Sequence, residues 1–112
     1  MLKIDAVLQP GKLEPVRQAL MAVGVEGMTV SEVRGHGRQK GHVEVYRGRE
    51  YKVDLRPKIR IEMVVPDDRK DDIIRVLSEA ARTGEIGDGK IFIEPVLEAV
   101  RIRNDDRNEL AL

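Results

Sequence analysis

The chain has 112 residues, which is the size of one domain. Its 20 lysine and arginine residues balance its 20 aspartate and glutamate residues, so bulk electrostatic binding to nucleic acid or to an anionic membrane is excluded as the main activity. It contains no cysteine, which excludes disulfides, thiol nucleophiles and cysteine-based metal sites.

The first half of the chain predicts a strand, a helix and a second strand. Apolar and polar residues alternate over 2–8, as they do in a half-buried strand. Residues 12–23 place apolar side chains at helical spacing, and Pro15 falls in the first turn, where its missing N–H costs little. Residues 28–34 are short and β-branched, which predicts the second strand.

The second half repeats this order. Residues 58–65 alternate clearly and predict a strand. A helix with an apolar stripe follows between Pro66 and Gly84, with aspartates at its positive end. Residues 91–96 and 97–103 predict two further strands, or one strand with a bend.

This order of elements predicts an α+β fold, the ferredoxin-like βαββαβ sandwich, in which two helices cover one face of an antiparallel four-stranded sheet. The loop between its second and third strands, residues 35–54, is far longer than the about two to five residues of a usual hairpin loop. Long loops usually carry function, and this one contains both tyrosines, so we interpret it as a functional segment, with a solvated insertion as the alternative. We expect the polar tail from Asn104 onward to be mobile.

The sequence also predicts a cellular setting and an assembly state. The longest apolar run, 19–23, is too short for a membrane span, and no signal peptide precedes the first apolar strand, so we expect a cytoplasmic protein. A chain this small and this poor in aromatic residues buries little surface alone, which favours oligomerisation.

The strongest local signal is the glycine-rich segment Thr83-Gly84-Glu85-Ile86-Gly87-Asp88-Gly89-Lys90. Its glycines let backbone N–H groups approach an anion, and Lys90 adds positive charge. A Walker nucleotide-hydrolase loop is excluded, because Ile91 replaces the required Ser or Thr and because the segment follows a helix. Arg101 and Arg103 share one face of the expected strand and could complete a polyphosphate clamp. The alternatives are an ordinary turn and a solvated sheet edge.

Other chemical constellations are weak. Residues 35–41 resemble a dinucleotide fingerprint but carry one residue too many and lead into a loop, although a backbone nest for an anion remains open. His36, His42 and Glu44 lack the rigid spacing of a metal site. No element of the chain brings together an acid, a base and a nucleophile, so the sequence does not indicate a catalytic site. The middle strands also lack the aromatic residues of an RNA-binding module.

Five motifs together resemble the PII nitrogen-regulatory signal-transduction family. They are Gly24–Val33, Gly37–His42, Tyr46–Tyr51, Arg82–Phe92 and Val100–Arg103. The resemblance runs from residue 1 to about residue 103. It implies a homotrimer of ferredoxin-like subunits that binds ATP or ADP between subunits, with 2-oxoglutarate and Mg²⁺ beside the phosphates. It also implies a regulator of nitrogen metabolism and not an enzyme, although slow ATP hydrolysis and a ligand-free interaction module remain alternatives.

The resemblance implies roles for particular residues. The nucleotide-binding residues would be Thr29, Gly37, Arg38, Gln39, Glu62, Val64, Gly87, Asp88, Gly89, Lys90, Arg101 and Arg103. The 2-oxoglutarate-binding residues would be Gln39, Lys40, Gly41 and Lys58, with Gln39 also holding Mg²⁺. Tyr51 matches the tyrosine that is uridylylated or adenylylated in many members.

The resemblance also divides the single domain, 1–112, into functional segments: a T-loop at about 36–55, a phosphate-binding B-loop at about 82–90 and a C-terminal tail at 104–112. The T-loop would dock on an ammonium transporter, a nucleotidylyltransferase or another nitrogen-metabolism enzyme, with membrane contact only through a transporter and none with nucleic acid. This chain departs from the family at His36 and Leu55, where Phe is usual, and in the tail. Arg49 excludes the serine phosphorylation used by some members at that site.

Overall fold

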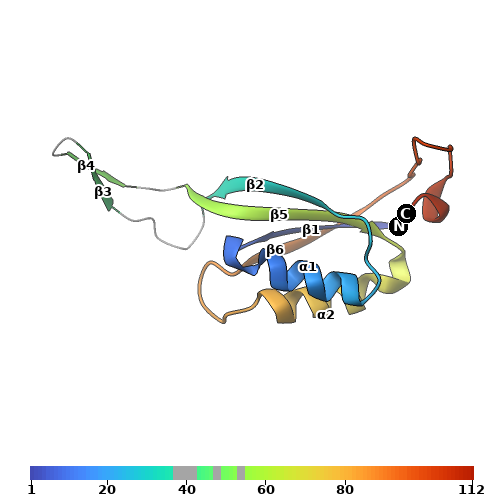
Figure 1. Ribbon diagram of the computed structural model, residues 1–112, viewed down its shortest axis with the longest axis horizontal. Helices are drawn as coiled ribbons and strands as arrows, with labels where there is room; N and C mark the ends of the chain where they lie inside the picture. Colours follow the sequence, from blue (N-terminus) through green and yellow to red (C-terminus); the bar gives the residue numbers. More distant parts are fainter. Residues whose placement is uncertain (37–42, 47–48, 53–54) are drawn as a thin grey trace.

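A four-stranded antiparallel sheet in the order β2-β5-β1-β6 forms the body of the chain (Figure 1). The computed structural model describes residues 1–36, 43–46, 49–52 and 55–112. The strands of this sheet are β1 (Leu2–Leu8), β2 (Thr29–Gly35), β5 (Arg56–Val65) and β6 (Gly89–Pro95). Every neighbouring pair in the sheet is antiparallel, so the predicted ferredoxin-like α+β fold is confirmed.

Two helices lie side by side on one face of this sheet (Figure 1). They are α1 (Leu13–Ala22) and α2 (Lys70–Ala81). Each begins with a short 3₁₀ turn, at Pro10–Lys12 and Asp67–Arg69, which turns the chain out of the preceding strand. Acidic residues stand in the first turn of both helices, where they oppose the positive end of the helix dipole.

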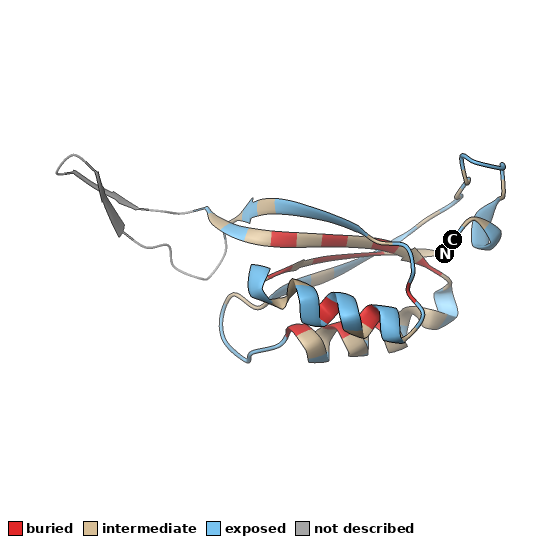
Figure 2. Ribbon diagram, in the orientation of Figure 1, coloured by how far each residue is buried: buried red, intermediate tan, exposed pale blue. Residues whose placement is uncertain are grey.

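The hydrophobic core fills the space between the sheet and the helices (Figure 2). Alternate residues of β1 and β5 point into it, and their register places Ile4 opposite Met63 and Ala6 opposite Ile61. Val16 and Leu20 of α1, with Ile73 and Leu77 of α2, close the core from the helix side. A slip of one residue would turn these side chains to the other face, so the alternation fixes the register.

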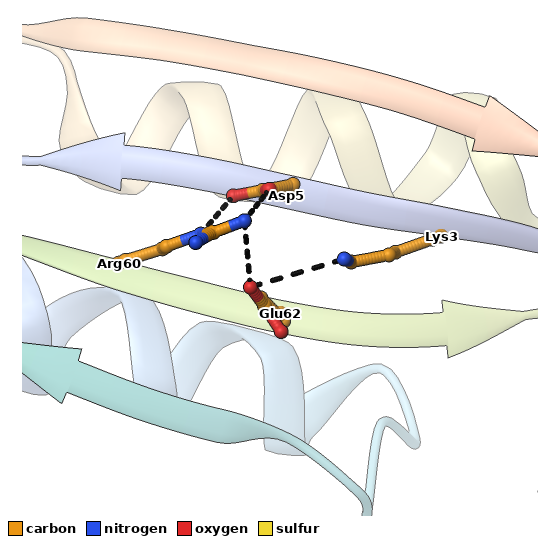
Figure 3. Close-up of polar contacts among 4 residues, drawn as sticks. All are labelled: Lys3, Asp5, Arg60 and Glu62. Carbon is orange, nitrogen blue, oxygen red and sulfur yellow. Dashed lines mark hydrogen bonds and ion pairs between the residues drawn. The ribbon is translucent and has the colours of Figure 1, made fainter.

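The opposite face of the sheet carries a network of charged side chains (Figure 3). Arg60 of β5 donates to both carboxylate oxygens of Asp5 in β1, with Nε–Oδ1 and Nη2–Oδ2 distances of 3.0 and 2.5 Å. The same Nη2 lies 2.8 Å from Glu62 Oε1, and Lys3 Nζ lies 3.9 Å from that oxygen. Asp5 is only 6% exposed, and its hydrogen bond from Arg60 lowers its pKa below the ordinary value. The sequence patterns did not single out this buried carboxylate.

The predicted strand over 97–103 is wrong for this chain. β6 ends at Pro95, and the segment that follows folds onto the tail, with an isolated bridge between Val100 and Arg107. The backbone of this segment pairs with the tail and not with the sheet, since the backbone N–H groups of Arg101 and Asn108 donate to the carbonyl oxygens of Asp106 and Ala99, respectively. The tail ends in a 3₁₀ turn at Asn108–Ala111, and its expected mobility stays a prediction.

The predicted long loop contains a short hairpin that the sequence patterns did not indicate. Its strands are β3 (Val43–Tyr46) and β4 (Arg49–Lys52), which pair in a two-stranded sheet of their own.

Among the described residues, no helix is long and apolar enough to cross a membrane.

Replacing Asp5 by Asn should lower the free energy of unfolding at pH 7 by about 1–2 kcal/mol, because a charge-assisted hydrogen bond to a partly exposed arginine is lost. The folded-state pKa of Asp5 lies below 3.8, its ordinary value, so this stabilisation is full above about pH 4 and lost as the pH falls through the folded pKa. Denaturant unfolding at pH 7 and at low pH, at equal protein concentration, measures the difference.

Glu26→Gln, at an exposed position, is the matched control and should change stability little at either pH. A deficit in Asp5→Asn that stayed constant at low pH would contradict the electrostatic account.

Candidate functional site

A cavity of about 720 Å³ lies where β6 begins, within the range usual for small-molecule sites. The turn before β6 forms one wall, and Gly35 and His36, at the end of β2, form another. Three cationic residues line it, Arg56 and Lys58 from β5 and Lys90 from β6. Glu85 and Asp88 also line it, and the carboxylate of Asp88 is held by the turn itself. The cations favour an anionic ligand.

The glycines of the turn before β6 adopt backbone conformations that side chains disfavour. Gly84, Gly87 and Gly89 have φ angles of +89°, +102° and +109°. At position 89 space is decisive as well, because a Cβ atom there would lie 1.8 Å from the carbonyl oxygen of Val7. The close approach at Gly89 is to strand β1. The expected approach of backbone N–H groups to an anion stays a prediction.

Asp88 holds this turn in shape. Its carboxylate accepts hydrogen bonds from the backbone N–H groups of Thr83 and Gly84, at 2.8 and 2.9 Å, and from the Thr83 hydroxyl. These bonds, from Thr83 above all, hold the pKa of Asp88 below its ordinary value. The Asp88 side chain thus positions the loop, a role that the sequence patterns assigned neither to it nor to Thr83.

Lys58 links β5 to the same turn. Its Nζ donates to the carbonyl oxygen of Gly87 at 3.0 Å. Burial, with the nearby charge of Arg56, lowers the pKa of Lys58. The residue expected to bind 2-oxoglutarate therefore contacts the segment expected to bind phosphate.

The structure divides the predicted site residues into two groups. Lys58 and the segment Gly87–Lys90 line the cavity. The remaining described residues do not line it: Thr29, Glu62, Val64, Arg101 and Arg103. In Figure 1 the segment that carries the two arginines lies at the end of the sheet away from the turn before β6. One chain alone does not bring the predicted phosphate ligands together.

Several predicted residues fall outside the described part of the chain. These are Gly37, Arg38, Gln39, Lys40 and Gly41. Tyr51 lies in β4 opposite Glu44, and only its backbone is described. Within the described residues, no group of three or more His, Asp or Glu side chains could hold a metal ion. The predicted Mg²⁺ ligand, Gln39, remains a prediction.

Comparison with known proteins gives a match over nearly the whole chain. Residues 1–106 match the family model described as nitrogen regulatory protein P-II. The chain is 54% identical to nitrogen regulatory protein P-II of Haemophilus influenzae over 112 residues, which is all of both chains. It is equally similar, at 54% over the full length of both chains, to nitrogen regulatory protein P-II 1 of Escherichia coli K12 and to nitrogen regulatory protein P-II of Pasteurella multocida.

Replacing Asp88 by Ala should loosen the turn before β6, because it removes the acceptor of the Thr83 and Gly84 amides. Hydrogen exchange of these two amides should accelerate by about tenfold or more, as expected when charge-assisted bonds are lost. Glu85→Ala, in the same turn but without a side-chain hydrogen bond or ion pair in the described structure, is the control and should leave both rates unchanged. Equal acceleration in both variants would contradict this role of Asp88.

Proposed function

The chain belongs to the nitrogen regulatory protein P-II family, and we propose that it senses ATP or ADP together with 2-oxoglutarate. Membership confirms the family resemblance of the sequence. A signal-transduction role in nitrogen regulation, in place of catalysis, and a cytoplasmic setting follow from this membership.

The cavity beside Gly87–Lys90 supports nucleotide binding more than any other feature. Gly87 and Gly89 have positive φ angles and no side chains, so the backbone of the turn is open to a ligand, and Lys58 and Lys90 supply positive charge. These groups are the donors that phosphate oxygens need. We therefore assign the phosphates of ATP or ADP to this turn, with Asp88 holding its shape.

We assign the rest of the nucleotide site to a neighbouring subunit of a homotrimer. Arg101 and Arg103 do not line the cavity of their own chain, so they would reach the phosphates of the next subunit. Thr29, Glu62 and Val64 would lie near the adenine base of the nucleotide. Exposed apolar side chains support a subunit contact here, since Leu97 and Ile102 are 96% and 97% exposed in a single chain.

The proposed site for 2-oxoglutarate adjoins the phosphates and includes Lys58, with Gln39, Lys40 and Gly41 at the base of the T-loop. Lys58 alone is too little positive charge for a dianion held away from water. Mg²⁺, bound by phosphate oxygens and Gln39, would supply the additional charge at this position. Lys58 and the loop base would then orient the ligand carboxylates.

The proposed output is the T-loop, at about 36–55. It would dock on an ammonium transporter, a nucleotidylyltransferase or another nitrogen-metabolism enzyme, and modification of Tyr51 would alter that docking. Tyr51 lies in the small sheet formed by β3 and β4, which is separate from the main sheet in the part of the chain that the structure describes. The B-loop at about 82–90 and the tail at 104–112 complete the single domain, 1–112.

Replacing Lys90 or Arg103 by Ala should weaken ATP binding by about ten- to a hundredfold, because each removes charge-assisted bonds to phosphate. Isothermal calorimetry on the folded variants measures the loss, and the oligomeric state should be unchanged. Arg17→Ala, which removes an exposed arginine of α1, is the control and should bind ATP as the wild type does. Unchanged affinity in Arg103→Ala would contradict the assigned site.

Binding of 2-oxoglutarate should depend on the nucleotide and the metal. It should be tight with Mg-ATP and weak with Mg-ADP or with ATP plus chelator, because only the γ-phosphate oxygens complete the metal shell. By linkage, 2-oxoglutarate should tighten ATP binding by the same factor. Calorimetric titrations under the three conditions measure this coupling, and equal affinities in all three would contradict it.

A further inference from the structure

The C-terminal segment holds Arg101 against a carboxylate of its own chain. Arg101 Nη1 lies 3.3 Å from Asp106 Oδ2, and the Arg101 backbone N–H donates to the carbonyl oxygen of Asp106 at 2.9 Å. Arg101 Nη2 also donates to the carbonyl oxygen of Leu112 at 3.4 Å. The guanidinium is therefore held by two acceptors of its own chain.

The carboxylate of Asp106 is fixed in place by the turn that carries it. Asn104 Nδ2 donates to Asp106 Oδ2 at 3.0 Å, and the Asp106 backbone N–H donates to Asn104 Oδ1 at 3.1 Å. Between them, Asp105 has a φ of 58°, the left-handed conformation that closes the turn. Asp106 thus faces Arg101 as a prepositioned acceptor.

Contacts at the base of the turn keep the two residues together. Val100 and Arg107 form a bridge, and Arg107 Nη1 lies 2.7 Å from Glu98 Oε1. The Asn108 backbone N–H donates to the carbonyl oxygen of Ala99 at 2.8 Å. The segment 98–108 is therefore a closed unit, and the pairing of Arg101 with Asp106 is part of its construction.

Resting on the proposed function, in which Arg101 binds nucleotide phosphate, we propose that Asp106 competes with that phosphate for the Arg101 guanidinium. Carboxylate and phosphate oxygens accept hydrogen bonds from the same planar set of N–H donors, so the guanidinium cannot serve both fully. Arg101 and Asp106 are 33% and 38% exposed, so their pair is weak enough for a polyphosphate to displace.

The competition falls on one arginine of the proposed clamp. Arg103 is exposed and has no hydrogen bond or ion pair within the described residues. Asp106 therefore lowers nucleotide affinity through Arg101 alone, and nucleotide binding releases Asp106 from that contact. Asp106 sets how much nucleotide is needed to fill the site.

The test compares ATP and adenosine in calorimetric titrations of the full-length wild type, Asp106→Asn and Asp105→Asn. Asp106→Asn should tighten ATP binding by about two- to fivefold, the range set by a partly exposed ion pair. Adenosine, which lacks phosphates, should bind both proteins equally. Asp105→Asn removes the same charge one residue away, from a side chain without a contact in the described structure, and Asn suits its left-handed backbone. It should bind ATP as the wild type does.

Equal ATP affinity in the wild type and Asp106→Asn would overturn the competition and leave the proposed nucleotide site standing. An equal gain in Asp105→Asn would also overturn it, because the gain would then reflect net charge alone. In the Arg101→Ala background, Asp106→Asn should give no gain, and a retained gain would count against the inference. Absence of ATP binding in every protein would overturn the proposed function and this inference with it.

Discussion

The close approach of Gly89 to Val7 is the constraint on which the candidate site depends. Only a residue without a Cβ atom lets β6 begin beside β1, because a Cβ at position 89 would lie 1.8 Å from the Val7 carbonyl oxygen. This start sets the register that places Lys90 opposite Val7 and sends the preceding turn over the end of the sheet. The cavity wall, its charge and the contact with Lys58 all follow from that geometry.

The two faces of β1 have different roles: one packs against the helices and the other carries charged side chains. Ile4 and its inward neighbours bury apolar surface against the helices, which supplies most of the folding free energy. Asp5, on the other face, accepts two hydrogen bonds from Arg60 and remains ionised with little exposure. The alternation of β1 thus gives the sheet an apolar face and a charged face, and a slip of one residue would exchange the two.

The fold could be predicted from the sequence because alternation over 2–8 and 58–65 reports which side of a strand is buried. The same kind of pattern was misleading over 97–103, because alternation does not show which backbone a segment pairs with, and this segment pairs with the tail. Asp5 escaped notice because its importance depends on the pairing with Arg60, far away in sequence. The glycine turn could be predicted from composition, whereas its contact with Lys58 required the packed sheet.

The hydrogen bond from Lys58 to the Gly87 carbonyl gives the Lys58 ammonium a structural role beside its proposed role in ligand binding. An ammonium has three N–H donors, so a carboxylate bound at the proposed 2-oxoglutarate site would share the Lys58 ammonium with the turn before β6. Ligand binding at Lys58 would then change how firmly the Lys58 side chain holds the turn before β6. Arg56, which lies near enough to lower the pKa of Lys58, adds to the pull on any such anion. Strand β5, the turn before β6 and the proposed ligand would therefore all be linked through the Lys58 ammonium.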